Sequence, residues 1–150
     1  MTDEWLNRGI LQTIEQCSFP AYWISLNKSV HCHCARQPGQ DSNPKCPDCL
    51  GTGHKIRIQE IKTVSQNIAA AFRIQGGVKE PAVLPVFFFA KRWPVQIDDL
   101  ITYGGKVFVM LTSDDKKGDN GSIVFYHCEA APKKANQAIF LANFNRIVGI

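Results

Sequence analysis

Residues 31–54 read HCHCARQPGQDSNPKCPDCLGTGH and contain four of the six cysteines of this 150-residue chain. Cys32 and Cys34 form a C-x-C pair, and Cys46 and Cys49 form a C-x-x-C pair after eleven intervening residues. Prolines, glycine and Asx residues between the pairs favour turns that bring the four sulfurs together. Soft thiolate ligands at about 2.3 Å suit tetrahedral zinc. The stretch predicts a structural zinc loop, because four protein ligands leave the ion no open position for substrate.

Glycine and histidine residues surround the second cysteine pair. Gly51 and Gly53 permit left-handed backbone angles that direct amide N–H groups at the thiolates, so CPDCLGTG is typical of a zinc knuckle that leads into a strand. Three histidines are alternative ligands: one of them either replaces a cysteine of the C-x-C pair or supports the ligands from outside. These histidines are His31, His33 and His54.

Other uses of paired cysteines are less well supported. A redox C-x-x-C lies between a strand and a helix, whereas proline and glycine flank Cys46 and Cys49. Haem attachment needs a histidine where Leu50 stands. Disulfides suit secreted chains, and the acidic start MTDE predicts no signal peptide. An iron–sulfur cluster and a cluster of free thiols remain alternatives to zinc.

Composition limits the organisation of the chain. With 45% hydrophobic and 20% charged residues, 150 residues can bury one core, so we expect a single domain over 1–150. Within it, 1–30 would be an N-terminal helix and docking segment, 31–54 the zinc loop, and 55–150 a β-barrel body with a C-terminal segment. The net charge of +4 is mild and its basic residues are scattered. No apolar run has the length of a membrane span, so we expect a soluble protein without a membrane partner.

The first thirty residues predict a short helix followed by an aromatic segment. Apolar residues recur at helical spacing before Pro20, which ends the helix. They are Trp5, Leu6, Ile10, Ile14 and Cys17. We interpret Phe19, Tyr22 and Trp23 as packing that holds the loop against the body. Cys17 and Cys128 fit buried hydrophobic positions.

After the loop the pattern changes to short strands. Ile56 and Ile58 alternate with polar residues, and the phase then slips before Ile61 and Val64, which predicts a bulge. Residues 83–90 form an apolar strand in which Pro85 indicates an edge or a bend. The clearest hairpin joins 100–103 to 106–111 through Gly104 and Gly105, and a second one returns over 122–128. We therefore predict a mainly β fold, a small β-barrel or sandwich with a short N-terminal helix and an inserted four-cysteine zinc loop. Residues 135–148 suit either a helix or a strand.

The polar tip Ser113 to Gly121 of the second hairpin does not match a calcium-binding loop, and we expect it to be solvated. Its charged or polar members form a possible channel or partner loop: Asp114, Asp115, Lys116, Lys117, Asp119 and Asn120. Residues 87–93, FFFAKRW, are the best nucleic-acid candidate. A buried strand that ends at a charged surface explains them better.

The sequence assembles no catalytic motif. It has no nucleotide-binding glycine loop, no nucleophile elbow and no metal motif with an open coordination position. Asp98 and Asp99 suit a turn between strands. We therefore expect a binding or structural protein and not an enzyme.

The helix, the C-x-C…PxCPxCxGTG loop and the unit DDLITYGGKVFVM…GSIVFYHCEA together resemble the neck or head-completion proteins of tailed bacteriophages, over about Cys32 to Ala130. The segment CPDCLGTG also resembles one cysteine-rich repeat of DnaJ-type chaperones, but those chaperones carry several such repeats and this chain has one. The resemblance implies a stopper-like head–tail connector protein of the virion neck, assembled in the host cytoplasm.

The same resemblance implies partners. The chain would form a homo-oligomeric ring, sixfold or twelvefold, that joins capsid to tail and completes or closes the DNA channel. Its neighbours would be the portal or an adaptor protein and the tail or tail-terminator proteins, with packaged double-stranded DNA passing through. The alternative is a zinc-containing β-barrel that binds single-stranded nucleic acid through FFFAKRW.

Overall fold

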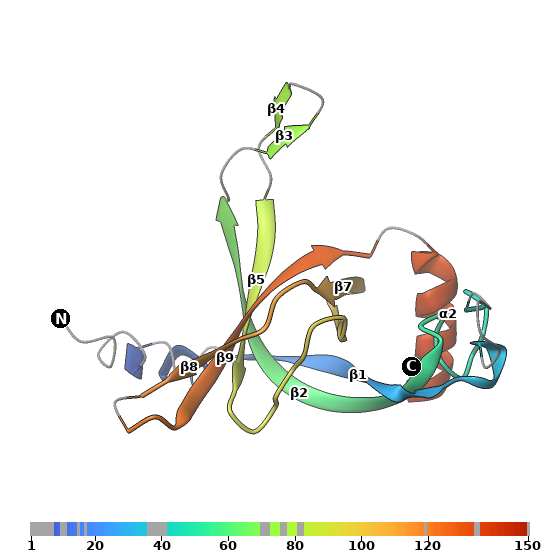
Figure 1. Cartoon of the computed structure of the whole chain (residues 1–150), viewed down its shortest axis with the longest axis horizontal. Coiled ribbons are helices and arrows are strands. Elements are labelled where there is room, and N and C mark those ends of the chain that lie inside the picture. The colour runs from blue at the N-terminus through green and yellow to red at the C-terminus, as the bar shows by residue number, and fades with distance from the viewer. Residues whose placement is uncertain are drawn as a thin grey trace.

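A computed structural model describes residues 8–9, 12–14, 16, 18–35, 42–69, 73–75, 78–80, 83–118, 120–133 and 136–149 (Figure 1). Its elements in chain order are β1 (Phe19–His31), the short 3-10 helix η1 (His33–Ala35), β2 (His54–Ala69), β3 (Arg73–Gln75), β4 (Val78–Glu80), β5 (Val83–Ala90), β6 (Leu100–Tyr103), β7 (Lys106–Met110), β8 (Asp114–Lys117), β9 (Ile123–Pro132) and the helix α2 (Gln137–Val148).

Six antiparallel strands close into a barrel. They follow the order β5-β2-β1-β6-β7-β9, and β9 returns to pair with β5. β8 adds to the other edge of β9, and β3 pairs only with β4. Closure satisfies the backbone groups that an open sheet would leave at its edges. The predicted mainly β fold is confirmed, and it is a barrel.

The barrel interior is filled by alternate residues of its strands. The buried members of this core are Ala21, Ile61, Phe87, Phe89, Val95, Ile101, Phe108, Met110, Cys128 and Ala130. The predicted burial of Cys128 is confirmed, since its side chain is completely enclosed. Cys17 lies outside the described residues. Pro85, as predicted, occupies a local edge: it pairs with Asn67 of β2, whereas pairing with β9 begins only at Val86.

Two helical segments cover the outer face of the barrel. α2 lays Phe140 and Phe144, one turn apart, on the outer residues of β1, β6 and β7. Ile14, in the helical residues 12–14, packs with Val86, Phe88 and Phe125 on the opposite outer surface. Of the other residues expected on the first helix, Trp5, Leu6 and Ile10 lie outside the described part. Residues 137–148, which suited either structure in the sequence, form the helix α2, which packs on the sheet through Phe140 and Phe144.

The expected bulge in β2 is wrong. Its register with β1 is regular from Lys55 to Thr63, and its register with β5 is regular from Thr63 onward. The hydrophobic pattern changes phase because the strand is covered on both faces. Ile56 and Ile58 pack outward beneath α2, whereas Ile61 points into the barrel.

The barrel begins earlier in the chain than predicted. Residues 19–31 are not only a docking segment, because β1 pairs with β2 over nine consecutive positions and with β6 at Tyr22 to Ile24. The metal loop is therefore an insertion between two barrel strands. The boundary at residue 55 for the barrel body is wrong for this reason.

The polar tip 113–121 is also shorter than predicted. Asp114, Asp115, Lys116 and Lys117 form β8, which pairs with Ile123 to His127 of β9. β7 pairs instead with the far end of β9, where Met110 faces Ala130. All four β8 side chains are exposed, so the expected solvation is confirmed. The backbone groups of β8 are satisfied by β9 although its side chains bury nothing.

Asp99 is a buried hydrogen-bond acceptor and not only a turn residue. Its Oδ2 accepts bonds of 2.9 Å from Trp23 Nε1 and from the Gln96 amide, and its Oδ1 accepts one of 3.2 Å from the Leu26 amide. Burial raises the pKa of this carboxyl above its ordinary value, and these three hydrogen bonds act in the opposite direction. Asp99 thereby fixes the loop before β6 against β1.

We predict that Asp99→Asn lowers the free energy of unfolding by about 1–3 kcal/mol, because the amide that replaces one oxygen cannot accept bonds from buried N–H donors. Asp98→Asn is the matched control. Asp98 is exposed, makes one ion pair of 3.1 Å with Lys28, and has a left-handed φ of 72° that asparagine tolerates. Loss of this ion pair in Asp98→Asn should lower the free energy of unfolding by at most about 1 kcal/mol. Urea unfolding of both variants measures the difference, and equal losses would contradict the role of Asp99.

Candidate metal centre

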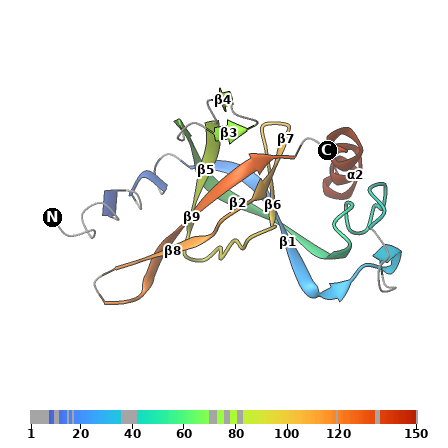
Figure 2. The same cartoon turned by 45° about the horizontal axis from the view of Figure 1, so that its top comes forward.

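The cysteine loop sits at the far end of the β1–β2 ribbon, beside α2 (Figure 2). β1 and β2 run together out of the barrel wall, and their pairing becomes irregular between Asn27 and His31 before His31 meets His54. The Cys32 amide then donates to the Gly53 carbonyl at 2.9 Å. The two ends of the loop are therefore held together by the ribbon itself.

The four cysteine sulfurs converge on one point. Cys32 Sγ lies 3.7 Å from Cys46 Sγ, and Cys34 Sγ lies 3.5 Å from Cys49 Sγ. All four sulfurs lie within 4.8 Å of one another. A tetrahedron with metal–sulfur bonds of about 2.3 Å has edges of about 3.8 Å. A disulfide bond is about 2.05 Å long, so these sulfurs are free thiols in metal-binding geometry.

The backbone around the site turns tightly at glycine. Gly51 and Gly53 have φ angles of 81° and 79°, and a Cβ there would lie 3.2 Å from Pro44 Cα and 3.1 Å from Ser42 Cβ. Leu50 shares the left-handed conformation at φ 53°. The Ser42 hydroxyl donates to the Gly51 carbonyl at 2.8 Å, which joins the two halves of the loop. Substitution of either glycine would therefore strain the turn and crowd the opposite half.

Burial and backbone amides act on the thiols in opposite directions. The pKa of Cys49 is raised to about 12. Burial is the largest cause, and hydrogen bonds from the backbone at Gly53 and Gly51 offset part of it. The backbone at Asn43 lowers the pKa of Cys34. Amide N–H groups directed at sulfur are the supporting interactions that a thiolate metal site needs. A bound cation would supply the remaining stabilisation of the negative charge.

The loop is attached to the barrel by packing as well as by the ribbon. Leu50, between Cys49 and Gly51, is 1% exposed and belongs to the cluster of Ile24, Leu100, Phe140 and Phe144 beneath α2. Asn143 of α2 donates to the Lys45 carbonyl at 3.4 Å. The sequence analysis missed both residues. The apolar Leu50 inside a polar loop was the available signal, since such a side chain needs a hydrophobic surface to cover it.

The three histidines lie outside the sulfur cluster. His33 is exposed, with Nδ1 3.5 Å from Cys32 Sγ and 3.4 Å from a carboxylate oxygen of Asp48. His31 and His54 lie ring to ring at 5.1 Å where the ribbon meets the loop. The four cysteines thus complete a tetrahedral ligand set by themselves. His33, Cys46 and Asp48 form a second group of potential ligands that shares Cys46.

The other predicted site residues do not join the cysteine cluster. Asp114, Asp115, Lys116 and Lys117 are exposed on β8, Asn120 is exposed beyond it, and Asp119 lies outside the described residues. In FFFAKRW the three phenylalanines are buried, and Lys91 and Arg92 are exposed. The Arg92 guanidinium packs 4.2 Å from the centre of the Trp93 ring. The interpretation of this segment as a buried strand with a charged end is confirmed.

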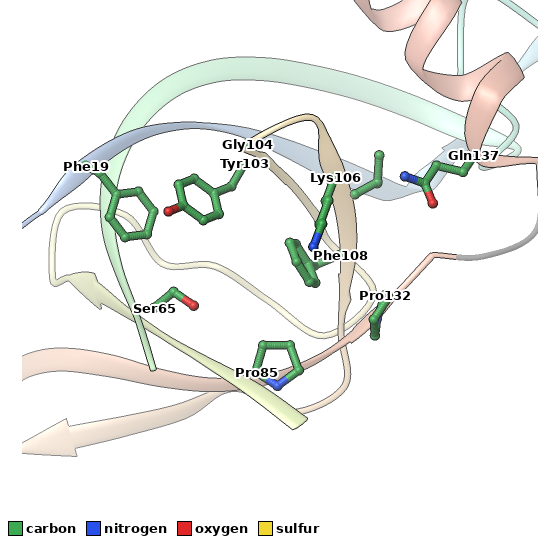
Figure 3. Close-up of a pocket in the computed structure, with 10 residues that line it drawn as sticks. Phe19, Ser65, Pro85, Tyr103, Gly104, Lys106, Phe108, Pro132 and Gln137 are labelled. Carbon is green, nitrogen blue, oxygen red and sulfur yellow. The ribbon is translucent and has the colours of Figure 1, made fainter. Parts of the chain in front are cut away.

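A cavity of about 800 Å³ opens at one end of the barrel (Figure 3). Phe19 and Tyr103 stack with ring centres 4.0 Å apart on one side, and Pro85 and Pro132 lie on the other. The ionisable residues of its lining are Tyr103 and Lys106. Among the residues that line it there is no carboxylate, imidazole or thiol.

The chain matches no protein-family model and no curated protein. In the part of the chain that the structure describes, no helix combines the length and the apolar character needed to cross a membrane. The functional argument therefore rests on the fold and on the geometry of the cysteine cluster.

We predict that replacing Cys46 and Cys49 with serine abolishes metal binding and exposes residues 32–53 to proteases, because hard hydroxyls replace two of the four soft ligands. The barrel should retain its far-UV circular dichroism, since its strands pair outside the loop. Cys128→Ala is the control, because Cys128 is buried in the barrel core away from the cluster. It should keep the metal. Equal metal content in the two variants would contradict the assignment.

Proposed function

We propose that this chain is a structural protein of the bacteriophage neck, where it forms a ring in the head–tail connector, completes or closes the DNA channel and joins capsid to tail. The resemblance to neck proteins motivates the proposal. The observation that supports it best is a closed barrel with several separate projections (Figure 1). Ring subunits need a stable body and contact elements that reach neighbours above, below and beside it.

Three projections leave the barrel. β2 and β5 continue together beyond it to Ala69 and Val83, and the β3–β4 hairpin follows (Figure 1). The β8–β9 hairpin extends in another direction, and the cysteine loop lies at a third place beside α2 (Figures 1 and 2). The β2–β5 and β8–β9 projections are paired strands, so they can present contacts at a distance from the core.

In this proposal the cysteine loop holds Zn²⁺ and braces one contact element. Sulfurs within 4.8 Å of one another fit a single ion, because the cysteines of a multi-iron cluster bind different iron atoms and stand farther apart. Zinc has no redox chemistry and prefers tetrahedral thiolates. It would supply rigidity to a polar loop that has one large apolar anchor, Leu50.

We predict that the full chain, purified under reducing conditions without chelator, carries about one zinc ion per subunit. Elemental analysis together with native mass spectrometry measures the metal and its stoichiometry. Iron in equal amount, or no metal, would contradict the zinc assignment.

The alternative function, a barrel that binds single-stranded nucleic acid through FFFAKRW, lacks most of its stacking surface, and the half-buried Trp93 packs against the barrel core and beneath Arg92. Phe87, Phe88 and Phe89 are each at most 9% exposed, and their rings pack against other side chains of the described core. Stacking on nucleobases requires an accessible ring face. The geometry therefore favours the neck proposal over this alternative.

We predict that neutralising β8 impairs particle assembly but not folding. In the variant Asp114→Asn, Asp115→Asn, Lys116→Gln and Lys117→Gln the net charge stays the same and four exposed side chains change. The free energy of unfolding should change by less than about 1 kcal/mol, since exposed ion pairs contribute little. Complementation of a phage that lacks the gene should then yield heads without joined tails.

The matched control is the exposed pair Glu60→Gln and Lys62→Gln on β2, which also conserves net charge. Normal virions from the β8 variant would remove β8 from the mechanism. Absence of the wild-type chain from purified particles, tested by immunoelectron microscopy, would overturn the neck function itself.

A further inference from the structure

A basic hollow lies on the β1–β2 ribbon between the barrel and the cysteine loop. It has a volume of about 590 Å³ and is bounded by β1, β2 and the segment before β6. Two cross-strand pairs form its floor, Ser25 opposite Arg57 and Asn27 opposite Lys55. Side chains opposite each other in antiparallel strands stand on the same face, so both cations point to the hollow with hydrogen-bonding neighbours.

The positive charge of the hollow is only partly neutralised within the chain. Lys28 pairs with Asp98 at 3.1 Å, whereas Lys55 and Arg57 form no ion pair among the residues that the structure describes. Asp99, which also borders the hollow, already accepts hydrogen bonds from Trp23, Gln96 and Leu26. Lys55 and Arg57, the β2 cations that border the hollow, are therefore available to an external anion.

The lining indicates which kind of anion fits. Apart from its cations and Asp99, it consists of polar and aliphatic residues, with no aromatic ring. Single-stranded nucleic acid is held largely by stacking of its bases on aromatic side chains. A duplex presents its phosphates outward and needs only cations and polar donors. The cationic and polar lining of the hollow therefore suits the phosphate backbone of a duplex.

We propose that Lys55 and Arg57 form a contact site for the phosphodiester backbone of double-stranded DNA. The inference deepens the proposed neck function and rests on it, since it assigns the surface that a ring would turn toward the DNA. The binding is independent of base sequence, because every contact is to phosphate. The affinity of a single subunit is low and depends strongly on salt.

The test uses the full chain and a fluorescent duplex of about 20 base pairs, titrated between about 50 and 200 mM salt. The test variant is Lys55→Gln with Arg57→Gln. The matched control is Lys62→Gln with Lys106→Gln, which removes the same charge: Lys62 is exposed on the opposite face of β2, and Lys106 is exposed at the barrel cavity.

The test variant should weaken duplex binding at least about tenfold at low salt and reduce the slope of log K against log salt by about two, the value for two lost phosphate contacts. The control should change both quantities little. Equal effects of the two variants, or tighter binding of a single-stranded oligonucleotide of the same length, would overturn the site. The neck function is judged separately by the presence of the chain in particles, so one can fail while the other stands.

Discussion

The antiparallel pairing of β1 with β2 is the constraint on which the rest of the structure depends. One uninterrupted register, from Phe19 opposite Thr63 to Asn27 opposite Lys55, builds part of the barrel wall and then leaves it as a ribbon. The same ribbon carries the basic hollow in its middle and the cysteine loop at its end. A one-residue slip would move Ile24 from the α2 cluster into the barrel and turn Arg57 to the opposite face. The barrel core therefore determines where both candidate sites stand.

The cysteine loop illustrates how a polar segment acquires a fixed structure. Its buried thiols are unfavourable as isolated anions, and its turns require left-handed backbone at Leu50, Gly51 and Gly53. Amide N–H groups and the insertion of Leu50 beneath α2 offset part of these costs, and a bound cation would offset more. Metal binding would therefore be coupled to loop order, whereas the barrel has its own apolar core.

The parts of the structure that local chemistry determines could be predicted from the sequence. The C-x-C and C-x-x-C spacings identified the cluster, and the glycine pair at 104–105 identified the β6–β7 hairpin. β1 was missed as a strand because both of its faces are covered, Trp23 inside and Ile24 outside, so it shows no alternation. The apparent phase slip in β2 has the same cause.

Two further elements depend on contacts distant in sequence. β8 has no apolar side chain, and only pairing with β9 makes it a strand. Asp99 resembles a turn residue until Trp23, 76 positions earlier, places its indole N–H against the carboxylate. Such pairings cannot be deduced from neighbouring residues, because the partner is selected by the closed barrel. Asn143, whose contact with the Lys45 carbonyl was found only in the structure, belongs to this class.

Helical segments cover parts of the outer face of the barrel, and this limits where other molecules can bind. α2 and the segment around Ile14 occupy two parts of the outer face, and side chains fill the core of the barrel. In the part of the chain that the structure describes, the projecting ribbons, the hollow beside one of them and the cavity at one end of the barrel remain for partners. The hollow is held from the barrel side by regular pairing through Asn27 and Lys55, while the irregular stretch to His31 separates it from the cysteine loop. The hollow and the cysteine loop therefore occupy different parts of a single ribbon, with the irregular stretch between them.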